Sequence, residues 1–294
     1  MVRLTDHYRR KFGCKVYKLG LDAGFTCPNR DGTLDTRGCI FCGDGGSAFA
    51  ERGGCITRQL EEAKKRVAFK GGEKFIAYFQ SYTNTYAPTE TLRRLFTQAM
   101  EAKDIVGLAI GTRPDCLGED VVALLQELNA QMPISVELGL QTVHPRSVAY
   151  IRRGYENRVY FDAVRRLKAA GLEVVTHIIL GLPGESTADM VQTTREAVAA
   201  GTDGVKFHLL HVLRGTDLED DYTLGRVTCM TMEQYCQALD ACLAVLRKQT
   251  VVHRITGDGA KKDLIAPLWS ADKKRVLQYL NTHLKNYKES SPIG

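Results

Sequence analysis

Residues 24–46 read GFTCPNRDGTLDTRGCIFCGDGG and hold three of the nine cysteines in the chain. Two residues separate Cys39 from Cys42, so both sulfurs can point at one centre. Cys27 can reach that centre across a glycine-rich loop. Three thiolates without an evident fourth favour an iron–sulfur cubane with one open iron, because structural zinc is nearly always closed by four ligands.

The remaining cysteines define the alternatives. In one alternative, the three cysteines bind zinc with Cys14 or Cys55 as the fourth ligand. In the other, they are buried thiols that bind no metal. No apolar run approaches the roughly 20 residues of a membrane helix, and the first residues carry charges where a signal peptide is apolar. We therefore expect a cytoplasmic protein with no membrane partner, where clustered cysteines indicate metal binding or catalysis rather than disulfides.

Composition agrees with an ordinary globular chain. Hydrophobic residues make up 44% and charged residues 25% of the 294 residues, which excludes a disordered chain. Lysine and arginine total 40 against 34 acidic residues, giving a net charge of +6. This excess is compatible with a polyanionic partner but does not demonstrate one.

Short apolar runs alternate with longer amphipathic stretches along the sequence. The runs are rich in Val, Ile, Phe and Tyr and end at glycine or polar residues, as buried parallel strands do. The predicted strands are 15–21, 74–80, 105–111, 134–139, 173–181 and 204–211. The predicted helices are 57–69, 89–102 with Thr89 as its cap, 119–130, 157–170, 186–200 and 231–248. Six strand–helix units predict an α/β fold, a parallel barrel or part of one.

Three segments follow from this rhythm. Residues 1–14 form a predicted N-terminal helical segment, residues 15–248 the barrel, and residues 249–294 a C-terminal α/β extension packed on the barrel. Chemistry in parallel barrels lies on the loops after the strands, so functional residues are expected there.

The cysteine loop resembles the cluster-binding loop of the radical S-adenosylmethionine (SAM) superfamily. Its long first gap and the words CPNRDGT and GCIFC resemble the YtqA/YhcC subgroup, whose members are related to the Elongator catalytic subunit. The likeness runs from KVYKLGLDAGFTCPNRDG (15–32) to RITGDGAKKDLIAPLW (254–269). It implies an incomplete (β/α)6 TIM-like barrel with a 4Fe-4S cluster held by the three cysteines and SAM as second cofactor.

The resemblance also implies SAM contacts at the strand ends. The implied set is Ser81 and Thr83 near the methionine amino group, Arg153 at its carboxylate, Gln141 and His177 at the ribose, and Leu210 and His211 at the adenine. The residues alone leave other interpretations open. Glu137 and Gln141 could belong to a buried polar network, His177 could be a core histidine, and Arg153 could be an exposed helix residue.

The implied activity is reductive cleavage of SAM to a 5′-deoxyadenosyl radical, with an electron from a donor such as a flavodoxin. The subgroup implies a tRNA substrate: conversion of a 5-carboxymethylaminomethyl group on wobble uridine to a 5-aminomethyl group. A small-molecule substrate and a zinc-stabilised nucleic-acid-binding protein without catalysis are the alternatives. Candidate substrate contacts in the tail are Arg254, Asp258, Lys261 and Trp269, and the Trp269 ring could instead anchor the tail.

Overall fold

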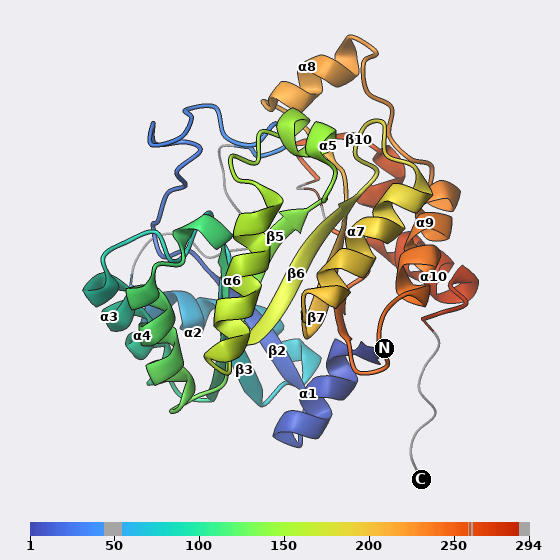
Figure 1. The fold of residues 1–294 in the computed structure, drawn as a ribbon. Helices are drawn as coiled ribbons and strands as arrows, with labels where there is room; N and C mark the ends of the chain where they lie inside the picture. Colours follow the sequence, from blue (N-terminus) through green and yellow to red (C-terminus); the bar gives the residue numbers. More distant parts are fainter. Residues whose placement is uncertain (44–54, 258, 260, 288–294) are drawn as a thin grey trace.

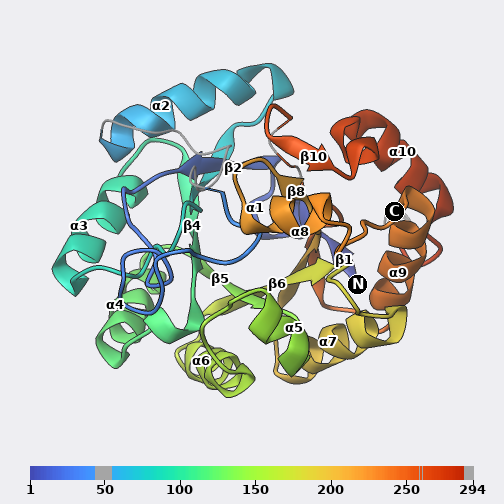
Figure 2. The ribbon, with the colours of Figure 1, turned by 90° about the horizontal axis from the view of Figure 1, so that it is seen from above.

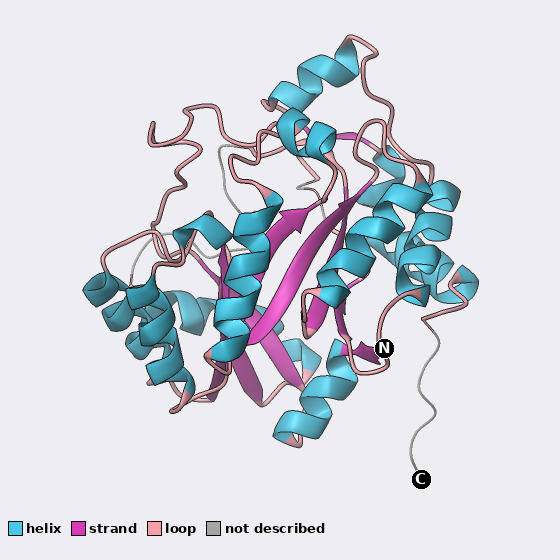
Figure 3. Ribbon diagram, viewed as in Figure 1, coloured by secondary structure: helices cyan, strands magenta, loops and turns pink. Residues whose placement is uncertain are grey.

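The computed structural model describes residues 1–43, 55–257, 259 and 261–287. Within them, eight strands form one parallel sheet in the order β1-β9-β7-β6-β5-β4-β3-β2. Figures 1 and 3 show the sheet curling like part of a barrel wall. The strands are β1 (Val2–Arg3), β2 (Val16–Leu21), β3 (Lys74–Phe79), β4 (Ile105–Thr112), β5 (Ile134–Gln141), β6 (Glu173–Leu180), β7 (Gly204–Leu209) and β9 (Val251–Arg254).

One helix covers the outer face after each strand from β2 to β7, and Figure 2 shows these helices as a ring around the sheet. They are α2 (Ile56–Val67), α3 (Thr89–Met100), α4 (Glu119–Asn129), α6 (Asn157–Ala169), α7 (Thr187–Ala199) and α9 (Met232–Ala244). The six predicted strand–helix units and the partial TIM-like barrel are therefore confirmed. No described helix is long and apolar enough to cross a membrane.

Shorter elements complete the described chain. The further helices are α1 (Leu4–Phe12), α5 (Pro145–Tyr150), α8 (Asp217–Thr223) and α10 (Lys273–His283). Single 3-10 turns lie at Ala68–Lys70, Pro114–Cys116 and Leu268–Ala271. Figure 1 shows α8 above the carboxyl ends of the strands and α1 below the opposite ends. Tyr8 of α1 packs with Ile76 and Tyr78 of β3, so α1 covers the lower end of the barrel.

The predicted cap at Thr89 is wrong. Pro88 occupies the N-cap of α3 and Thr89 is the first helical residue. The Thr89 hydroxyl donates instead to Asp120 Oδ2 at 2.5 Å and ties α3 to α4. Side-chain caps occur elsewhere: Ser186 and Asp189 form a capping box at the start of α7, which satisfies N–H groups that the helix leaves unpaired.

The predicted C-terminal extension contributes a strand to the sheet. β9 pairs with β7, and β1 pairs with β9 on its other side. The sheet therefore continues past residue 248, and the division into segments remains a prediction. Farther along, β10 (Leu264–Ala266) pairs antiparallel with β8 (Val212–Leu213). The Trp269 indole N–H donates to the Met230 carbonyl at 2.9 Å, as the tail-anchor alternative requires.

Side chains on each strand alternate between two environments. Outward side chains such as Phe79, Ile110 and Leu138 are fully buried against the helices and form the main hydrophobic core. Inward positions instead carry polar or charged groups, including Glu137 and Lys206. Because successive strand residues point to opposite faces, one strand serves both environments.

Candidate functional site

A cavity of about 340 Å³ opens from the cysteine loop into the barrel. Seven of the predicted site residues line it: Cys27, Thr83, Cys39, Cys42, Gln141, Arg153 and His177. Its inner part is lined by Tyr78, Glu137, Lys206, His208 and Arg254. The cysteines and the inward face of the strands therefore share one chamber.

Asn29 holds the cysteine loop against the barrel. Its side chain is 2% exposed, and its Nδ2 donates to the carbonyls of Arg152 at 2.7 Å and Arg153 at 3.2 Å. The same amide lies 3.6 Å from Cys39 Sγ. Gly154 makes this packing possible, because its φ is +81° and an added Cβ would lie 2.5 Å from Asn29 Oδ1.

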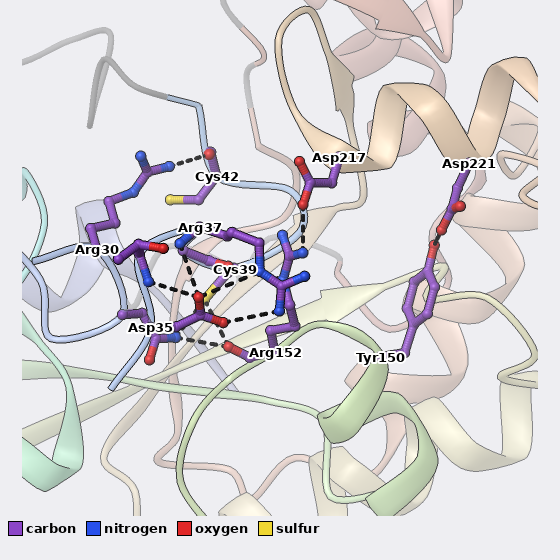
Figure 4. Close-up of polar contacts among 12 residues, drawn as sticks. Arg30, Asp35, Arg37, Cys39, Cys42, Tyr150, Arg152, Asp217 and Asp221 are labelled. Carbon is purple, nitrogen blue, oxygen red and sulfur yellow. Dashed lines mark hydrogen bonds and ion pairs between the residues drawn. The ribbon is translucent and has the colours of Figure 1, made fainter. Parts of the chain in front are cut away.

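Two arginines brace the loop from other sides (Figure 4). Arg30 donates to the carbonyls of Cys42 and Gly43. Arg152 donates through Nε to the Gly38 carbonyl at 3.1 Å and through Nη1 to Asp217 Oδ2 at 2.5 Å. These contacts leave the loop's sulfurs facing the cavity while its carbonyls are tied to the protein.

The three thiols are close enough to influence one another. None of the three forms a disulfide in the described part of the chain, and burial raises the pKa of Cys39 to about 12, with further increases from the Cys42 and Cys27 thiols. Such sulfurs suit a bound cationic metal centre, which would stabilise their thiolate forms. No three His, Cys, Asp or Glu side chains in the described part of the chain are arranged to hold a single metal ion.

The interpretation of Arg153 as an exposed helix residue is wrong, because the residue is 1% exposed and follows the end of α5. All five of its N–H groups are engaged: Nε with the Tyr155 carbonyl, Nη1 with the carbonyls of Leu140 and Thr142, and Nη2 with the Tyr155 carbonyl and Asn157 Oδ1. A salt bridge to a methionine carboxylate, as predicted for Arg153, would have to replace some of these bonds.

Arg113 also lines this cavity, and its side chain forms an ion pair. It makes a two-pronged contact with Asp115 at 2.9 and 2.7 Å and donates to the Arg153 carbonyl at 3.0 Å. The ion pair joins two residues of the turn that follows β4. The Tyr155 ring packs against both guanidinium groups. Its centroid lies 4.9 Å from Cζ of Arg113 and 4.5 Å from Cζ of Arg153.

The two residues predicted near the methionine amino group lie at the end of β3. Thr83 is 1% exposed and lines the cavity. Ser81 is fully buried, does not line it, and its Oγ has no hydrogen-bond partner. Tyr82 between them has a φ of +57°, a left-handed conformation that costs free energy outside glycine.

Leu210 and His211 line a second, smaller cavity of about 220 Å³. It shares Phe41, Gln141 and His177 with the main cavity, so the two adjoin. The predicted adenine and ribose contacts therefore lie on one continuous surface. Their roles toward SAM stay predictions.

A buried ion cluster lies on the inner face of the sheet. Glu137 is 1% exposed, and Lys18 and Lys206 each place Nζ 2.5 Å from its carboxylate. Tyr78 donates to Glu137 Oε2 at 2.7 Å, and His177 Nε2 lies 2.8 Å from the same oxygen. The polar network that the sequence left open at Glu137 is thus present, and His177 belongs to it.

Burial and charge shift the pKa values of this cluster. Burial opposes ionisation of Glu137, but Lys18 and Lys206 hold its pKa well below the usual range. Burial lowers the pKa of Lys206 to about 7, assisted by repulsion from Lys18 and Arg254. Burial also lowers the pKa of His177 to about 4, so its ring is neutral near pH 7.

The sequence analysis missed Lys18, Tyr78 and Lys206 as site residues. The signal was a lysine inside an apolar run, in VYKLGL and GVKFHL. A lysine there is buried only with a partner, but the sequence does not reveal which strand supplies it. Among the surface arginines, Arg93 pairs with Glu127 and Arg165 pairs with Asp162. Asp258 lies outside the described residues.

The sequence pattern of the Radical SAM superfamily matches residues 36–197. The chain belongs to the radical SAM superfamily of enzymes. The pattern of the Radical SAM C-terminal domain matches residues 202–286. The subgroup resemblance is also confirmed by relatives of similar length. The chain is 43% identical to the YtqA protein of Bacillus subtilis over 286 residues, which is 96% of this chain and 89% of that protein.

More distant members of the superfamily match as well. The chain is 36% identical to the YhcC protein of Escherichia coli K12, over 93% of this chain and 90% of YhcC. It is 28% identical to a tRNA uridine(34) acetyltransferase of Methanocaldococcus jannaschii, over 60% of this chain and 33% of that enzyme. The solved Elp3 structure from Methanocaldococcus infernus shares its fold, with a TM-score of 0.67, 19% identity, and coverage of 91% of this chain and 63% of the other.

Proposed function

We propose that this radical SAM protein holds a 4Fe-4S cluster through Cys27, Cys39 and Cys42 and cleaves SAM beside it. The observation that carries the proposal is that three thiols of one loop line the same cavity as the inner face of the barrel. When bound, the cluster and SAM supply a 5′-deoxyadenosyl radical that removes a hydrogen atom from substrate. A flavodoxin-type donor would supply the electron.

The chain's own residues bind SAM and exclude water. Thr83, Gln141 and His177 line the main cavity, and Leu210 and His211 line the adjoining one. We assign the methionine end of SAM to Thr83, the ribose to Gln141 and His177, and the adenine to Leu210 and His211. The orphaned hydroxyl of Ser81, next to this wall, is a polar group that a small shift would bring into contact. Arg153 and Tyr155 act by positioning, since Arg153 fixes the backbone around the cavity.

For the substrate we propose tRNA, and for the step the conversion of a 5-carboxymethylaminomethyl group on the wobble uridine to 5-aminomethyl. SAM would serve as the two-electron oxidant: loss of a hydrogen atom from the carboxymethyl carbon, and then of one electron returned to the redox centre, would leave an imine that water splits into the aminomethyl group and glyoxylate. Support comes from the relatives, one of which is named for tRNA uridine 34. We place the reaction in the cytoplasm. Such a side chain is a slender polar extension, which suits entry into a chamber of about 340 Å³.

The test uses protein purified and reconstituted without oxygen. It is incubated with SAM, dithionite and tRNA that carries the carboxymethylaminomethyl group, and the nucleosides are then quantified. The proposal predicts 5-aminomethyluridine together with 5′-deoxyadenosine, and neither product from Cys39→Ala. Formation of 5′-deoxyadenosine with unchanged tRNA would overturn the substrate and favour a small molecule.

A further inference from the structure

The inner end of the main cavity has more positive charge than its carboxylate can balance. Among the described residues lining the cavity, Glu137 is the one carboxylate. It already accepts from Lys18, Lys206, Tyr78 and His177. Arg254 lines the same space and adds another cation. A carboxylate shared by two lysines cannot also neutralise a guanidinium.

The sheet places Arg254 in this position. In the β7–β9 pair the register shifts after Val205, so Lys206 lies opposite Arg254 rather than His253. Such a bulge re-aims side chains next to a site. Within the described chain, the Arg254 guanidinium makes no hydrogen bond and no ion pair. Arg113 and Arg153, which line the same cavity, instead make three and five hydrogen bonds to protein atoms.

A buried ring nitrogen on the cavity wall also lacks a partner. Nε2 of His208 has no hydrogen-bond partner among the described residues. Buried polar atoms are normally satisfied, so an orphaned one in a cavity that also holds an unbalanced cation indicates a place for a polar ligand. The chemistry of the surroundings, cationic with neutral histidines, selects an anion.

We propose that Arg254 and Lys206 bind the carboxylate at the end of the substrate's side chain. The inference deepens the proposed function and rests on it: it names the residues that recognise a wobble side chain ending in a carboxylate. Arg254 supplies a planar fork that matches a carboxylate, and Lys206 supplies a point charge.

A side-chain carboxylate fits this place better than a backbone phosphate. The cluster lies inside the barrel, whose lower end is covered by α1 through the packing of Tyr8 against Tyr78. A phosphate diester is joined to the RNA on two sides and would need the whole strand to enter. A terminal carboxylate can enter alone, with the remainder of the RNA outside.

The experiment compares two anticodon stem–loops that differ in one group. One carries the carboxymethylaminomethyl side chain and the other the corresponding carboxamide, which has the same shape without the charge. Dissociation constants are measured with the reconstituted protein and SAM, without reductant. The protein is expected to bind the acid roughly tenfold to a hundredfold more tightly than the amide. Contacts to phosphates cancel in this ratio.

Three variants test the assignment. Arg254→Gln and Lys206→Met are each expected to reduce the ratio toward one. The control is Arg165→Gln, whose side chain is 73% exposed on an outer helix, and it should keep the wild-type ratio. Melting temperatures verify that each variant is folded. Arg254 has no hydrogen-bonding or ion-pairing partner to lose among the residues that the structure describes, so its variant provides the test even if Lys206→Met unfolds.

The outcomes separate this inference from the proposed function. Equal binding of acid and amide by the wild type, binding of neither, or an unchanged ratio in Arg254→Gln overturns the carboxylate site. A charge-dependent ratio that Arg254→Gln abolishes supports it. If that ratio is found but reduced protein never converts the acid, the proposed reaction is wrong while the carboxylate site stands.

Discussion

On the outer face of β5, Val136, Leu138 and Leu140 are fully buried against helices, whereas the inner face of the same strand carries Glu137 and Gln141. A parallel strand buried on both faces is usually apolar throughout. Hydrophobic burial on the outer face stabilises the fold. The buried charges on the inner face reduce that stability, because removing them from water costs free energy. The difference teaches that polar residues at alternate positions of an apolar strand mark the wall of a chamber.

The largest effect is expected from the loop above the inner face. Cys39→Ala should remove the bound iron and all 5′-deoxyadenosine formation, because a cubane with an open iron needs every thiolate of the trio. Iron content and product are measured on oxygen-free protein. Cys236→Ala, a buried thiol on the outer side of the sheet, is the matched control and should change neither. Equal losses in the two variants would contradict the assignment.

Within the inner face, Glu137→Gln is expected to lower the free energy of unfolding by about 3–5 kcal/mol. The substitution keeps the shape of the side chain but leaves Lys18 and Lys206 without their shared counter-charge. Urea denaturation measures the change. A variant as stable as the wild type would show that the two lysines do not depend on this carboxylate.

Leu138, the neighbour of Glu137 on the outer face of β5, should affect stability but not ligand preference. Leu138→Ala should lower the free energy of unfolding by about 2–5 kcal/mol by leaving a cavity in the hydrophobic core. Its preference for the acid stem–loop over the amide should stay as in the wild type, because no charged group moves. If this preference falls while the protein remains folded, the two faces are not independent.

The smallest effect concerns pH. Burial lowers the pKa of Lys206 to about 7 from 10.5, so in the free protein it is charged below that pH and neutral above it. The acid stem–loop should therefore bind several-fold more weakly as pH rises from 6 to 8. Loss is partial because Arg254 remains as the second contact to the carboxylate. The amide stem–loop and Lys206→Met should lack this dependence, and a pH-independent ratio in the wild type would contradict it.

The other groups that face Lys206 do not reproduce this titration. Glu137 stays ionised and His177 stays neutral over that interval, since their pKa values are shifted downward. Burial likewise keeps the pKa values of His208 and His253 well below their usual range. Tyr78 keeps its proton because burial raises its pKa, and the Glu137 charge holds the pKa of Lys18 above its usual range against the effect of burial.

Much of the fold could be predicted because its signals are local. The strand–helix rhythm predicts six units, and the predicted helices 157–170 and 186–200 end one residue beyond the ends of α6 and α7. Gly171 and Gly201, both with positive φ, follow these helices. The pairing of β9 with β7 could not be predicted, because it depends on how the sheet curls. The prediction at Thr89 failed for a non-local reason. Threonine has a high preference for N-caps, but the Thr89 hydroxyl donates to Asp120 of another helix instead.

The site was less predictable because its contacts cross the barrel. The spacing of the cysteines in the loop is visible in the sequence, whereas Lys18, Glu137 and Lys206 meet from three different strands. Lys18 and Glu137 are 119 residues apart, and Glu137 and Lys206 are 69 residues apart. The family resemblance implies that Arg153 pairs with the methionine carboxylate. In the structure its five N–H groups donate to backbone carbonyls and to the Asn157 side chain, and no sequence pattern indicates these contacts.

The central claim is that Cys27, Cys39 and Cys42 hold an iron–sulfur cluster above the charged inner face. Metal analysis with a single-turnover assay tests this claim most directly. Protein purified without oxygen is analysed for iron and zinc, then reduced with dithionite in the presence of SAM. We predict about four irons per chain and formation of 5′-deoxyadenosine and methionine. Protein that contains stoichiometric zinc, binds no iron and leaves SAM intact would contradict the account.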